Sequence, residues 1–265
     1  MKEQILKHLP PAYPWTEHLQ CFPSLGSTND HLRALAKAGA LAGTAVLADH
    51  QTGGHGRRGR SFHSPEGVGV YLSLLLRPDC PPAQLMHLTC AVAVAMCDAV
   101  EASAGFRPAI KWTNDLVSGK RKLGGILTEI GFNPKGNVDW VIIGVGINCC
   151  QHLSDFPKEI RDMAGSLSMI AQTPINRAKV AADMLTQLHR MSEKLLGRKE
   201  EILNQYRADC MTLGQDVVLV RGEEKRYGHA LDIDGSGALV VRFGDGQTET
   251  VNSGEISVRG MYGYV

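Results

Sequence analysis

Along the first two thirds of the chain, hydrophobic and polar residues repeat in patterns that predict both strands and helices. Short apolar runs, separated by glycine or Asn-Pro turns, predict strands at 44–49, 68–77, 110–112, 123–130 and 140–147. Helical spacing predicts a capped helix from residues 27–29 to Gly39, a helix over 84–101 that is apolar on nearly every side, and two helices within 176–209. Because three strand connections look like hairpins, we expect a mixed or largely antiparallel sheet flanked by helices, which is an α+β fold.

The last fifth of the chain has a different pattern of hydrophobic and polar residues. Short alternating runs bounded by glycine or acidic turns predict five strands, at 216–221, 225–233, 237–243, 247–251 and 255–258. Five short strands in about fifty residues favour a small barrel or curled sheet. Prolines around Trp15 favour a short helical turn followed by an extended arm. We therefore expect an arm at 1–20, a main domain at 21–210 and a barrel at 211–265.

Composition narrows the class of protein. With 43% hydrophobic and 21% charged residues among 265, the chain is that of an ordinary globular protein. A net charge of +1 gives no overall positive field that would favour nucleic acid or a membrane surface. The most apolar stretch, Leu85–Cys97, is too short to cross a bilayer, and the first residues lack the apolar core of a signal peptide. We expect a cytoplasmic protein that contacts no membrane.

The seven cysteines are dispersed along the chain and form no CxxC pair. A framework of disulfides or a zinc site would need a more regular spacing. We expect reduced, mostly buried thiols and no metal site built from cysteine.

The segment from His50 to Arg60 combines four glycines with three arginines between two predicted strands. Glycine allows the backbone to approach an anion closely, and arginine supplies a permanent charge and a planar fork for phosphate or carboxylate. The segment lacks the GxxxxGK[ST] of a P-loop, and the helix that follows a dinucleotide fingerprint is replaced by a strand. These features predict a cradle for phosphate or carboxylate, with an RNA-binding or merely soluble surface tract as the alternative.

Two further segments carry candidate chemistry at the ends of predicted strands. In the first, Lys111, Asn114 and Asp115 offer a cation, an amide and a carboxylate, and Asp115 could hold Mg²⁺ or orient Lys111. The alternative is a plain Asn-Asp turn. In the second, Lys122 precedes a double glycine that would let a ligand lie flat on the strand, so it is a candidate carboxylate anchor or else a solvated lysine after a turn.

In their order and spacing, these segments resemble one family, the biotin protein ligases. The resemblance runs from about residue 21 to the C-terminus. It is carried by Ser27-Thr28-Asn29, Gln51 with the GHGRRGR loop, KWTNDL at 111–116, RKLGGIL at 121–127, GVGIN at 144–148 and Gly254-Glu255-Ile256-Ser257. It implies a catalytic domain related to the class II aminoacyl-tRNA synthetases, with a mixed sheet and flanking helices, followed by a small SH3-like barrel.

The resemblance also implies a reaction in two halves. The carboxylate of biotin attacks the α-phosphorus of ATP to give biotinyl-5′-AMP and pyrophosphate, and a lysine of the biotin carboxyl carrier protein of acetyl-CoA carboxylase then attacks the mixed anhydride. Mg²⁺ would accompany ATP, with no site fixed by the protein alone and Asp115 as a side chain that could reach it. The catalytic residues implied are Lys122, Arg57, Asp115 and Lys111.

Binding roles follow from the same resemblance. Biotin would contact Ser27, Thr28, Asn29, Gln51, Gly54, His55, Gly56, Arg57, Lys122, Gly124 and Gly125. ATP would contact Arg57, Arg58, Arg60, Phe62, Lys111, Asn114, Asp115 and Asn148.

Three positions depart from the usual pattern of the family. His55 stands where arginine is usual, Thr113 where proline is usual, and Gly26 where an acidic residue often precedes Ser-Thr-Asn. The first matters most, because histidine titrates near neutral pH and its share in stabilising an anion is in question.

The resemblance leaves several functions to compare. A lipoate or octanoate protein ligase would use the same chemistry on a related fold, and a non-catalytic phosphate- or RNA-binding module would use the arginine loop alone. Only about twenty residues precede the expected catalytic domain, so we expect no DNA-binding domain of the kind that some family members carry. Some family members form dimers, which leaves a homodimer as one option.

Overall fold

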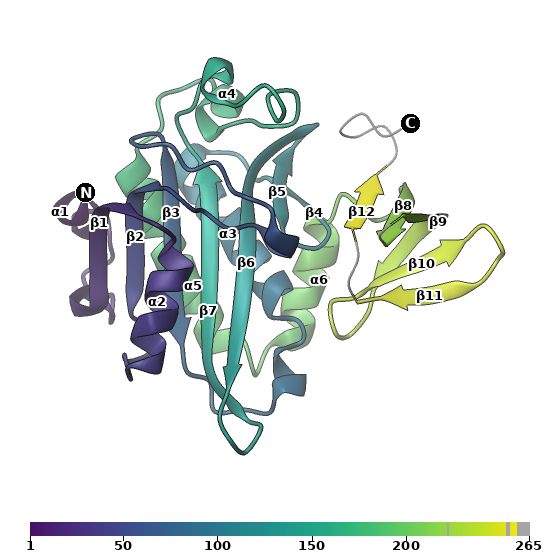
Figure 1. Ribbon diagram of the computed structural model, residues 1–265, viewed down its shortest axis with the longest axis horizontal. Coiled ribbons are helices and arrows are strands. Elements are labelled where there is room, and N and C mark those ends of the chain that lie inside the picture. The colour runs from purple at the N-terminus through teal and green to yellow at the C-terminus, as the bar shows by residue number, and fades with distance from the viewer. Residues whose placement is uncertain (222, 253–254, 259–265) are drawn as a thin grey trace.

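The computed structural model describes residues 1–221, 223–252 and 255–258. Its centre is a seven-stranded sheet in the order β1-β2-β3-β7-β6-β5-β4 (Figure 1). The strands are β1 Leu19–Leu25, β2 Ala45–Gln51, β3 Gly69–Leu76, β4 Ala109–Lys111, β5 Asp115–Ser118, β6 Arg121–Phe132 and β7 Val138–Asn148. β1 and β2 are parallel and all other neighbours are antiparallel, which confirms the expected mixed sheet.

Helices cover both faces of this sheet. α2 lies on one face, and α3 and α5 pack together on the other, with α6 beside α3 (Figure 1). The helices are α1 Lys2–Leu6, α2 Thr28–Lys37, α3 Leu88–Ala104, α4 Leu167–Ala171, α5 Arg177–Lys194 and α6 Lys199–Asp209. Short 3₁₀ turns lie at Thr16–His18, Arg57–Gly59, Pro82–Leu85 and Leu153–Asp155. The predicted break between the last two helices is confirmed.

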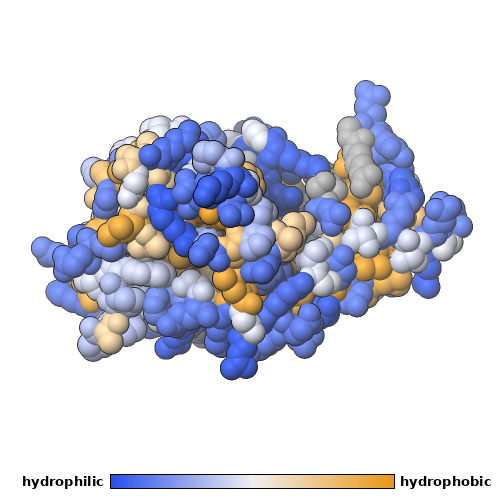
Figure 2. Space-filling view, turned by 90° about the horizontal axis from the view of Figure 1, so that it is seen from below, coloured by the Kyte–Doolittle hydropathy of each residue, from blue (hydrophilic) through white to orange (hydrophobic). Residues whose placement is uncertain are grey.

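α3 is the central helix of the larger core. The segment Pro82–Ala104 is long and apolar enough, by composition alone, to cross a membrane, but 67% of its most apolar window is buried inside the protein. Its side chains pack on α5, α6 and the sheet, as expected for a helix that is apolar on most sides. The face in Figure 2 is mainly hydrophilic, and its apolar residues lie in several separate groups, one of them over the C-terminal sheet. All seven cysteines are free, and five of them are buried.

Alternation along β7 opens space for a site. Trp140 and Ile142 face α2 and pack with Leu32 and Ala36 in a small second core. Further along the same face, the positions that would continue this row of large side chains are Gly144 and Gly146, which carry no side chain. The residues between them belong to the larger core beneath α3 and α5. The sheet is therefore covered at one end of this face and bare at the other, beyond the N-terminus of α2.

The C-terminal part is a five-stranded antiparallel sheet in the order β11-β10-β9-β8-β12. Its strands are β8 Asp216–Arg221, β9 Glu224–Ile233, β10 Leu239–Phe243, β11 Thr248–Val251 and β12 Glu255–Val258. All five predicted strands are confirmed, and so is the α+β fold class. Gly254, one residue of the resemblance, lies outside the described residues. Contacts to the first sheet include the bond from the Trp112 indole to Gly237 O, at 3.1 Å.

Three elements were not predicted. β1 contains Pro23, which an edge strand tolerates, and it begins within the expected arm, so it runs across the expected boundary between residues 20 and 21. β5 is four residues long and follows directly on Asn114, in a segment that reads as a turn. α4 has five residues, too few for a helical period to show.

Candidate active site

A cleft lies on the bare end of the sheet, between the N-terminus of α2, the glycine and arginine loop, and strands β6 and β7. Its lining combines most of the residues singled out from the sequence with several that were not: Ser27, Thr28, Asn29, Gln51, His55, Gly56, Arg57, Arg58, Arg60, Ser61, Phe62, Lys111, Trp112, Asn114, Asp115, Lys122, Gly125, Ile126, Leu127, Gly144, Val145 and Gly146. The lining carries five arginine or lysine side chains and one carboxylate, Asp115. Such a cleft favours an anionic ligand.

Glycines of β7 let two side chains lie flat against the sheet. A Cβ at Gly144 would collide with the amide of Asn29, and one at Gly146 would come within 2.5 Å of the Phe62 ring. Asn29 is thereby set into the floor of the cleft, and Phe62 forms a wall that the loop supplies.

Lys122 and Asp115 form an ion pair on neighbouring strands at one end of the cleft. The Lys122 Nζ lies 2.6 Å from Asp115 Oδ1, and the two side chains are 36% and 20% exposed. Asp115 thus contacts Lys122. Lys111, the lysine that the sequence suggested it could orient, is buried on β4 and lies opposite Asp115 in the strand register. A Cβ at Gly125 would lie 3.5 Å from Lys122 Cε, so this glycine leaves open the space beside the lysine.

Arg57 extends from the loop toward the end of the cleft that holds Lys122 and Asp115, where it contacts Asn114. Its Nη1 donates to Asn114 Oδ1 at 3.1 Å, and Asn114 Nδ2 donates to Ile126 O at 2.9 Å. Burial and the neighbouring Arg58 lower the pKa of Arg57, whereas Asp115 opposes the shift. Arg58 itself has a positive φ of 58°, which is uncommon for a residue with a side chain. An anion bound here would relieve the repulsion between the two guanidinium groups.

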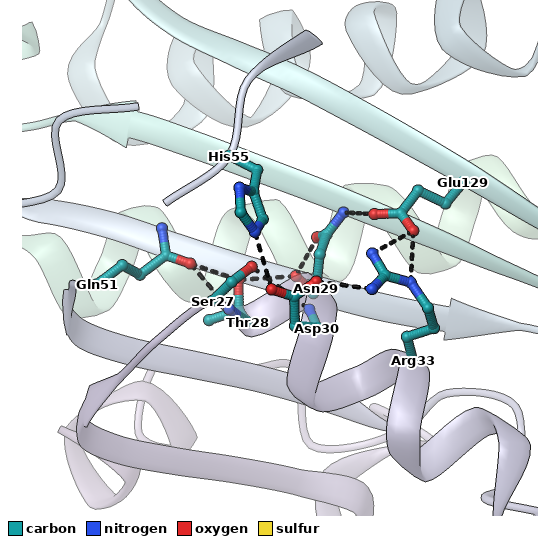
Figure 3. Close-up of polar contacts among 9 residues, drawn as sticks. Ser27, Thr28, Asn29, Asp30, Arg33, Gln51, His55 and Glu129 are labelled. Atoms are coloured by element: carbon teal, nitrogen blue, oxygen red, sulfur yellow. Dashed lines mark hydrogen bonds and ion pairs between the residues drawn. The ribbon is translucent and has the colours of Figure 1, made fainter. Parts of the chain in front are cut away.

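A hydrogen-bonded cluster closes the other end of the cleft (Figure 3). Gln51 Oε1 accepts from the Thr28 backbone N–H at 2.9 Å and from the Thr28 hydroxyl at 3.1 Å. Gln51 Nε2 donates to Ser64 Oγ at 3.0 Å, and Ser64 Oγ donates to Phe62 O at 2.9 Å. The cluster therefore connects the start of α2 to the base of the loop.

His55 ties the loop to the first turn of α2. Its Nε2 lies 2.8 Å from Asp30 Oδ2, and both side chains are about half exposed. Partial burial would raise the pKa of Asp30, but hydrogen bonds from His55 and Arg33 outweigh it and hold that pKa below its usual value. The residue that departs from the family pattern at the loop thus has an acidic partner in this chain.

Comparisons with known proteins agree with this geometry. Residues 21–148 match the Biotin/lipoate A/B protein ligase family, and residues 212–259 match the Biotin protein ligase C terminal domain. The bifunctional ligase/repressor BirA of Bacillus subtilis is 37% identical over 238 residues, which cover 87% of this chain and 71% of that protein. The biotin–[acetyl-CoA-carboxylase] ligase of Mycobacterium tuberculosis is 32% identical over 237 residues, which cover 87% of this chain and 85% of that one.

The chain belongs to the biotin protein ligase family. Among solved structures, the biotin protein ligase of Aquifex aeolicus in complex with biotin and ATP aligns with a TM-score of 0.76 at 29% identity, over 91% of this chain and 98% of that one.

Three of the residues predicted for this biotin protein ligase site do not line the cleft. Asn148 is buried, and its amide donates to Gly165 O at 2.9 Å and accepts from Gln151 at 3.2 Å. Gly54 and Gly124 lie just outside the lining, where a Cβ would come within 2.7 Å of Phe62 O and 2.6 Å of Gly146 O. The two glycines therefore serve close packing of backbone around the cleft.

Other residues of the biotin protein ligase cleft were missed by the sequence interpretation. They are Ser61, Trp112, Ile126, Leu127, Gly144, Val145 and Gly146. The alternation of β7 could have identified its two glycines, because they share a face with Trp140 and Ile142. Within the part of the chain that the structure describes, no three His, Cys, Asp or Glu side chains are grouped as metal ligands.

Proposed function

We propose that this biotin protein ligase activates biotin with ATP and transfers it to a lysine of the biotin carboxyl carrier protein of acetyl-CoA carboxylase. The observation that carries the proposal is the two-ended cleft. One end gathers lysine and arginine side chains around a single carboxylate, and the other presents a neutral cluster of hydroxyl and amide groups. Biotin has the matching polarity, with a carboxylate at the end of its chain and a ureido group on its rings.

In the first half-reaction, a biotin carboxylate oxygen attacks the α-phosphorus of ATP and pyrophosphate leaves. Lys122 would hold the carboxylate, with its own position set by Asp115. Arg57 would bridge the carboxylate and the α-phosphate, where negative charge develops. The geometry of Arg57 is set by Asn114, which is itself fixed by Ile126 O. Holding both reactants in this way supplies much of the rate enhancement of a bimolecular step.

The nucleotide would lie along the cationic side of the cleft. Arg58, Arg60 and Lys111 would contact its phosphates, and Phe62 would shield the adenylate from water. Asp115 is the one carboxylate on the lining, and Lys122 already contacts it. That arrangement fits a Mg²⁺ ion carried mainly by phosphate oxygens, and such an ion would neutralise charge on the leaving pyrophosphate.

In the second half-reaction, the carrier lysine attacks the carbonyl carbon of biotinyl-5′-AMP, AMP leaves, and an amide forms. The carrier lysine must first lose a proton, and Asp115 is the candidate acceptor within the lining. We retain the division at residues 210/211 and a cytoplasmic location as proposals, whereas the division at 20/21 falls inside β1. Light scattering on the purified protein would show whether it forms a homodimer.

The competing ligase function would place lipoate or octanoate in the same cleft. Neither the dithiolane ring of lipoate nor the alkyl end of octanoate carries an N–H or carbonyl group to pair with Thr28 and Gln51, so the polar end of the cleft would be desolvated without compensation. The polar cluster therefore favours biotin. A non-catalytic phosphate- or RNA-binding module would use the arginine loop and leave the Lys122–Asp115 pair without a role.

ATP–pyrophosphate exchange tests the proposal most directly, because it isolates adenylation from recognition of the carrier. Purified protein with Mg²⁺ would be assayed in parallel with biotin, lipoate, octanoate and no acid. Exchange with biotin alone is the expected result. Exchange with lipoate or octanoate alone would transfer the assignment to the related ligases, and no exchange with any acid would refute adenylation.

Gly125→Ala should weaken biotin binding while leaving the fold intact. The added methyl group would meet nothing closer than 3.5 Å in the free protein, but it would fill the space beside Lys122. We expect biotin-dependent exchange to fall at least about tenfold, with a melting temperature within about 2 °C of wild type. Gly197→Ala is the control, because a Cβ at Gly197 would meet nothing within 4 Å and this glycine is not part of the cleft lining; it should exchange at the wild-type rate. Normal exchange by Gly125→Ala would mean that no ligand passes over this glycine.

His55→Arg should retain the adenylate longer than wild type at pH 8. Arginine stays charged where histidine exchanges its proton, so its pair with Asp30 would hold the loop closed at higher pH. Because the pair is half exposed, we expect a change of only about two- to fivefold in the release rate of labelled adenylate. An equal release rate of the two proteins at pH 8 would exclude a charge-dependent role for His55.

A further inference from the structure

A charged pair outside the sequence motifs lies directly behind the polar end of the cleft (Figure 3). Arg33, on the second turn of α2, donates from Nε and Nη2 to Glu129 Oε2 on β6, at 2.8 and 2.6 Å. Its Nη1 donates to Asp30 Oδ1 at 2.7 Å. The other oxygen of Glu129, Oε1, accepts from Asn29 Nδ2 at 2.7 Å. Glu129 thus receives the guanidinium on one oxygen and the Asn29 amide on the other.

This contact sets the direction of a chain of hydrogen bonds. A carboxylate only accepts, so the NH₂ group of Asn29 must face Glu129, and its carbonyl Oδ1 must face the other way. A longer contact of the same NH₂ group with Leu127 O, at 3.4 Å, favours the same orientation. Oδ1 there accepts from the hydroxyl of Ser73 at 2.6 Å. Ser73 Oγ lies 2.8 Å from the Thr28 hydroxyl, and its single hydrogen is committed to Asn29. The Thr28 hydroxyl hydrogen therefore serves either this contact or the 3.1 Å contact with Gln51 Oε1, and in both cases the two lone pairs of Thr28 Oγ1 are left to accept.

The far end of the chain has a fixed direction as well. The backbone N–H of Thr28 donates to Gln51 Oε1, so the NH₂ group of Gln51 faces Ser64 with one hydrogen left over. The cleft thereby offers an acceptor at Thr28 and a donor at Gln51. A cyclic urea presents the complementary pattern, with N–H donors beside a carbonyl acceptor.

We propose that Glu129 is a positioning residue for recognition of the biotin ureido group: it sets the orientation of the Asn29 amide and, through Ser73, the acceptor state of Thr28. The proposal rests on the proposed function. Glu129 itself does not line the cleft, so its effect passes through Asn29. Asn29 is only 4% exposed and cannot exchange a lost partner for bulk water.

Glu129→Gln should reverse the donors and acceptors along this chain of hydrogen bonds, because the new side chain has nearly the same shape but carries an NH₂ group. The Arg33 guanidinium needs an acceptor, so it would draw the oxygen of the introduced amide and leave the NH₂ group of that amide toward Asn29. To accept from it, Asn29 would turn its Oδ1 to the introduced NH₂ group and its own NH₂ to Ser73, and would give up its 3.4 Å contact with Leu127 O. Ser73 would in turn donate to Thr28 and occupy one of the two lone pairs of its hydroxyl oxygen, which leaves a single lone pair for the ligand.

The experiment is steady-state ATP–pyrophosphate exchange by wild type and Glu129→Gln. We expect the KM for biotin to rise about tenfold, the effect of one misdirected hydrogen bond, with kcat and the KM for ATP within twofold of wild type. Desthiobiotin, which keeps the ureido group, should show the same rise. The proposal would be overturned by a rise in the KM for ATP, by a fall in kcat without a rise in the KM for biotin, or by no change in any of these constants.

A double variant separates positioning from simple loss of structure. In Arg33→Met/Glu129→Gln the guanidinium is absent, so the oxygen of the introduced amide is free to face Asn29 again. We expect a lower KM for biotin than in Glu129→Gln alone, although the double variant has also lost the Arg33–Asp30 ion pair. A KM equal to or above that of the single variant would contradict the proposed direction of the chain.

Two further variants complete the design. Asp209→Asn removes a carboxylate that pairs with Arg107 away from the cleft, and it should leave the KM for biotin unchanged. If Glu129→Gln does not fold, Ser73→Ala tests the same chain from its other side, with the same expected rise in the KM for biotin and an unchanged KM giving the contrary result. Loss of biotin-dependent exchange in wild type itself would instead refute the proposed function.

Discussion

Lys122→Ala should slow adenylate formation by about 30- to 1000-fold, because loss of a charge-assisted contact to a reacting oxyanion costs about 2–4 kcal/mol. The Lys122 ammonium is held 2.6 Å from Asp115 before any substrate binds, and its side chain is about one-third exposed, at 36%. It therefore meets the biotin carboxylate in a position that requires little ordering. The measurement is biotin-dependent ATP–pyrophosphate exchange at saturating ATP.

Lys120→Ala is the matched control, since Lys120 is an exposed lysine on the turn that leads into the same strand. It should exchange at the wild-type rate. Lys122→Arg keeps the charge but not the compact ammonium, and we expect it to restore only part of the activity. Exchange near the wild-type rate in Lys122→Ala would remove Lys122 from the proposed mechanism.

Much of the fold could be predicted from the sequence, because hydrophobic residues recur at regular intervals in the helices and strands that form the core. β7 alternates between two buried faces, and α3 is apolar on most sides, so both were found close to their observed positions. The N-cap of α2 was also readable, since Ser27 accepts from the Asp30 N–H as a capping residue does. β1 and β5 escaped because an edge strand with a proline and a four-residue strand leave no clear period.

The site was predictable only where chemistry is concentrated in a short segment. The arginine loop and the lysine before the double glycine carry their own signals, and both reach the cleft. Glu129 could not be found in this way, because its link to Arg33 spans 96 residues and depends on how α2 packs against β6. Asn148 shows the reverse case, since its position at a strand end suggested a ligand contact but its amide turns toward Gly165. Side-chain direction at a loop is set by neighbours that the local sequence does not reveal.

Arg57→Ala should lower the rate of adenylate formation by about 100- to 1000-fold, with a smaller effect on the KM for biotin. Loss of one preorganised donor to a developing oxyanion has an effect of about this size. Arg57 is partly buried, its pKa is lowered by that burial and by Arg58, and Asn114 fixes its direction, so its charge acts in a site that water screens poorly. Single-turnover formation of labelled biotinyl-AMP measures the chemical step without product release.

Two comparisons decide between loss of charge and loss of structure at Arg57. Arg57→Lys keeps a cation without the planar fork, and we expect it to stay at least about tenfold below wild type because a lysine cannot bridge carboxylate and phosphate with parallel N–H groups. Arg198→Ala removes an arginine that is 69% exposed and paired only distantly with Glu201, at 3.8 Å, so it should form the adenylate at the normal rate. Full activity in Arg57→Lys would show that a point charge suffices, whereas full activity in Arg57→Ala would assign the bridging role to another cation on the cleft.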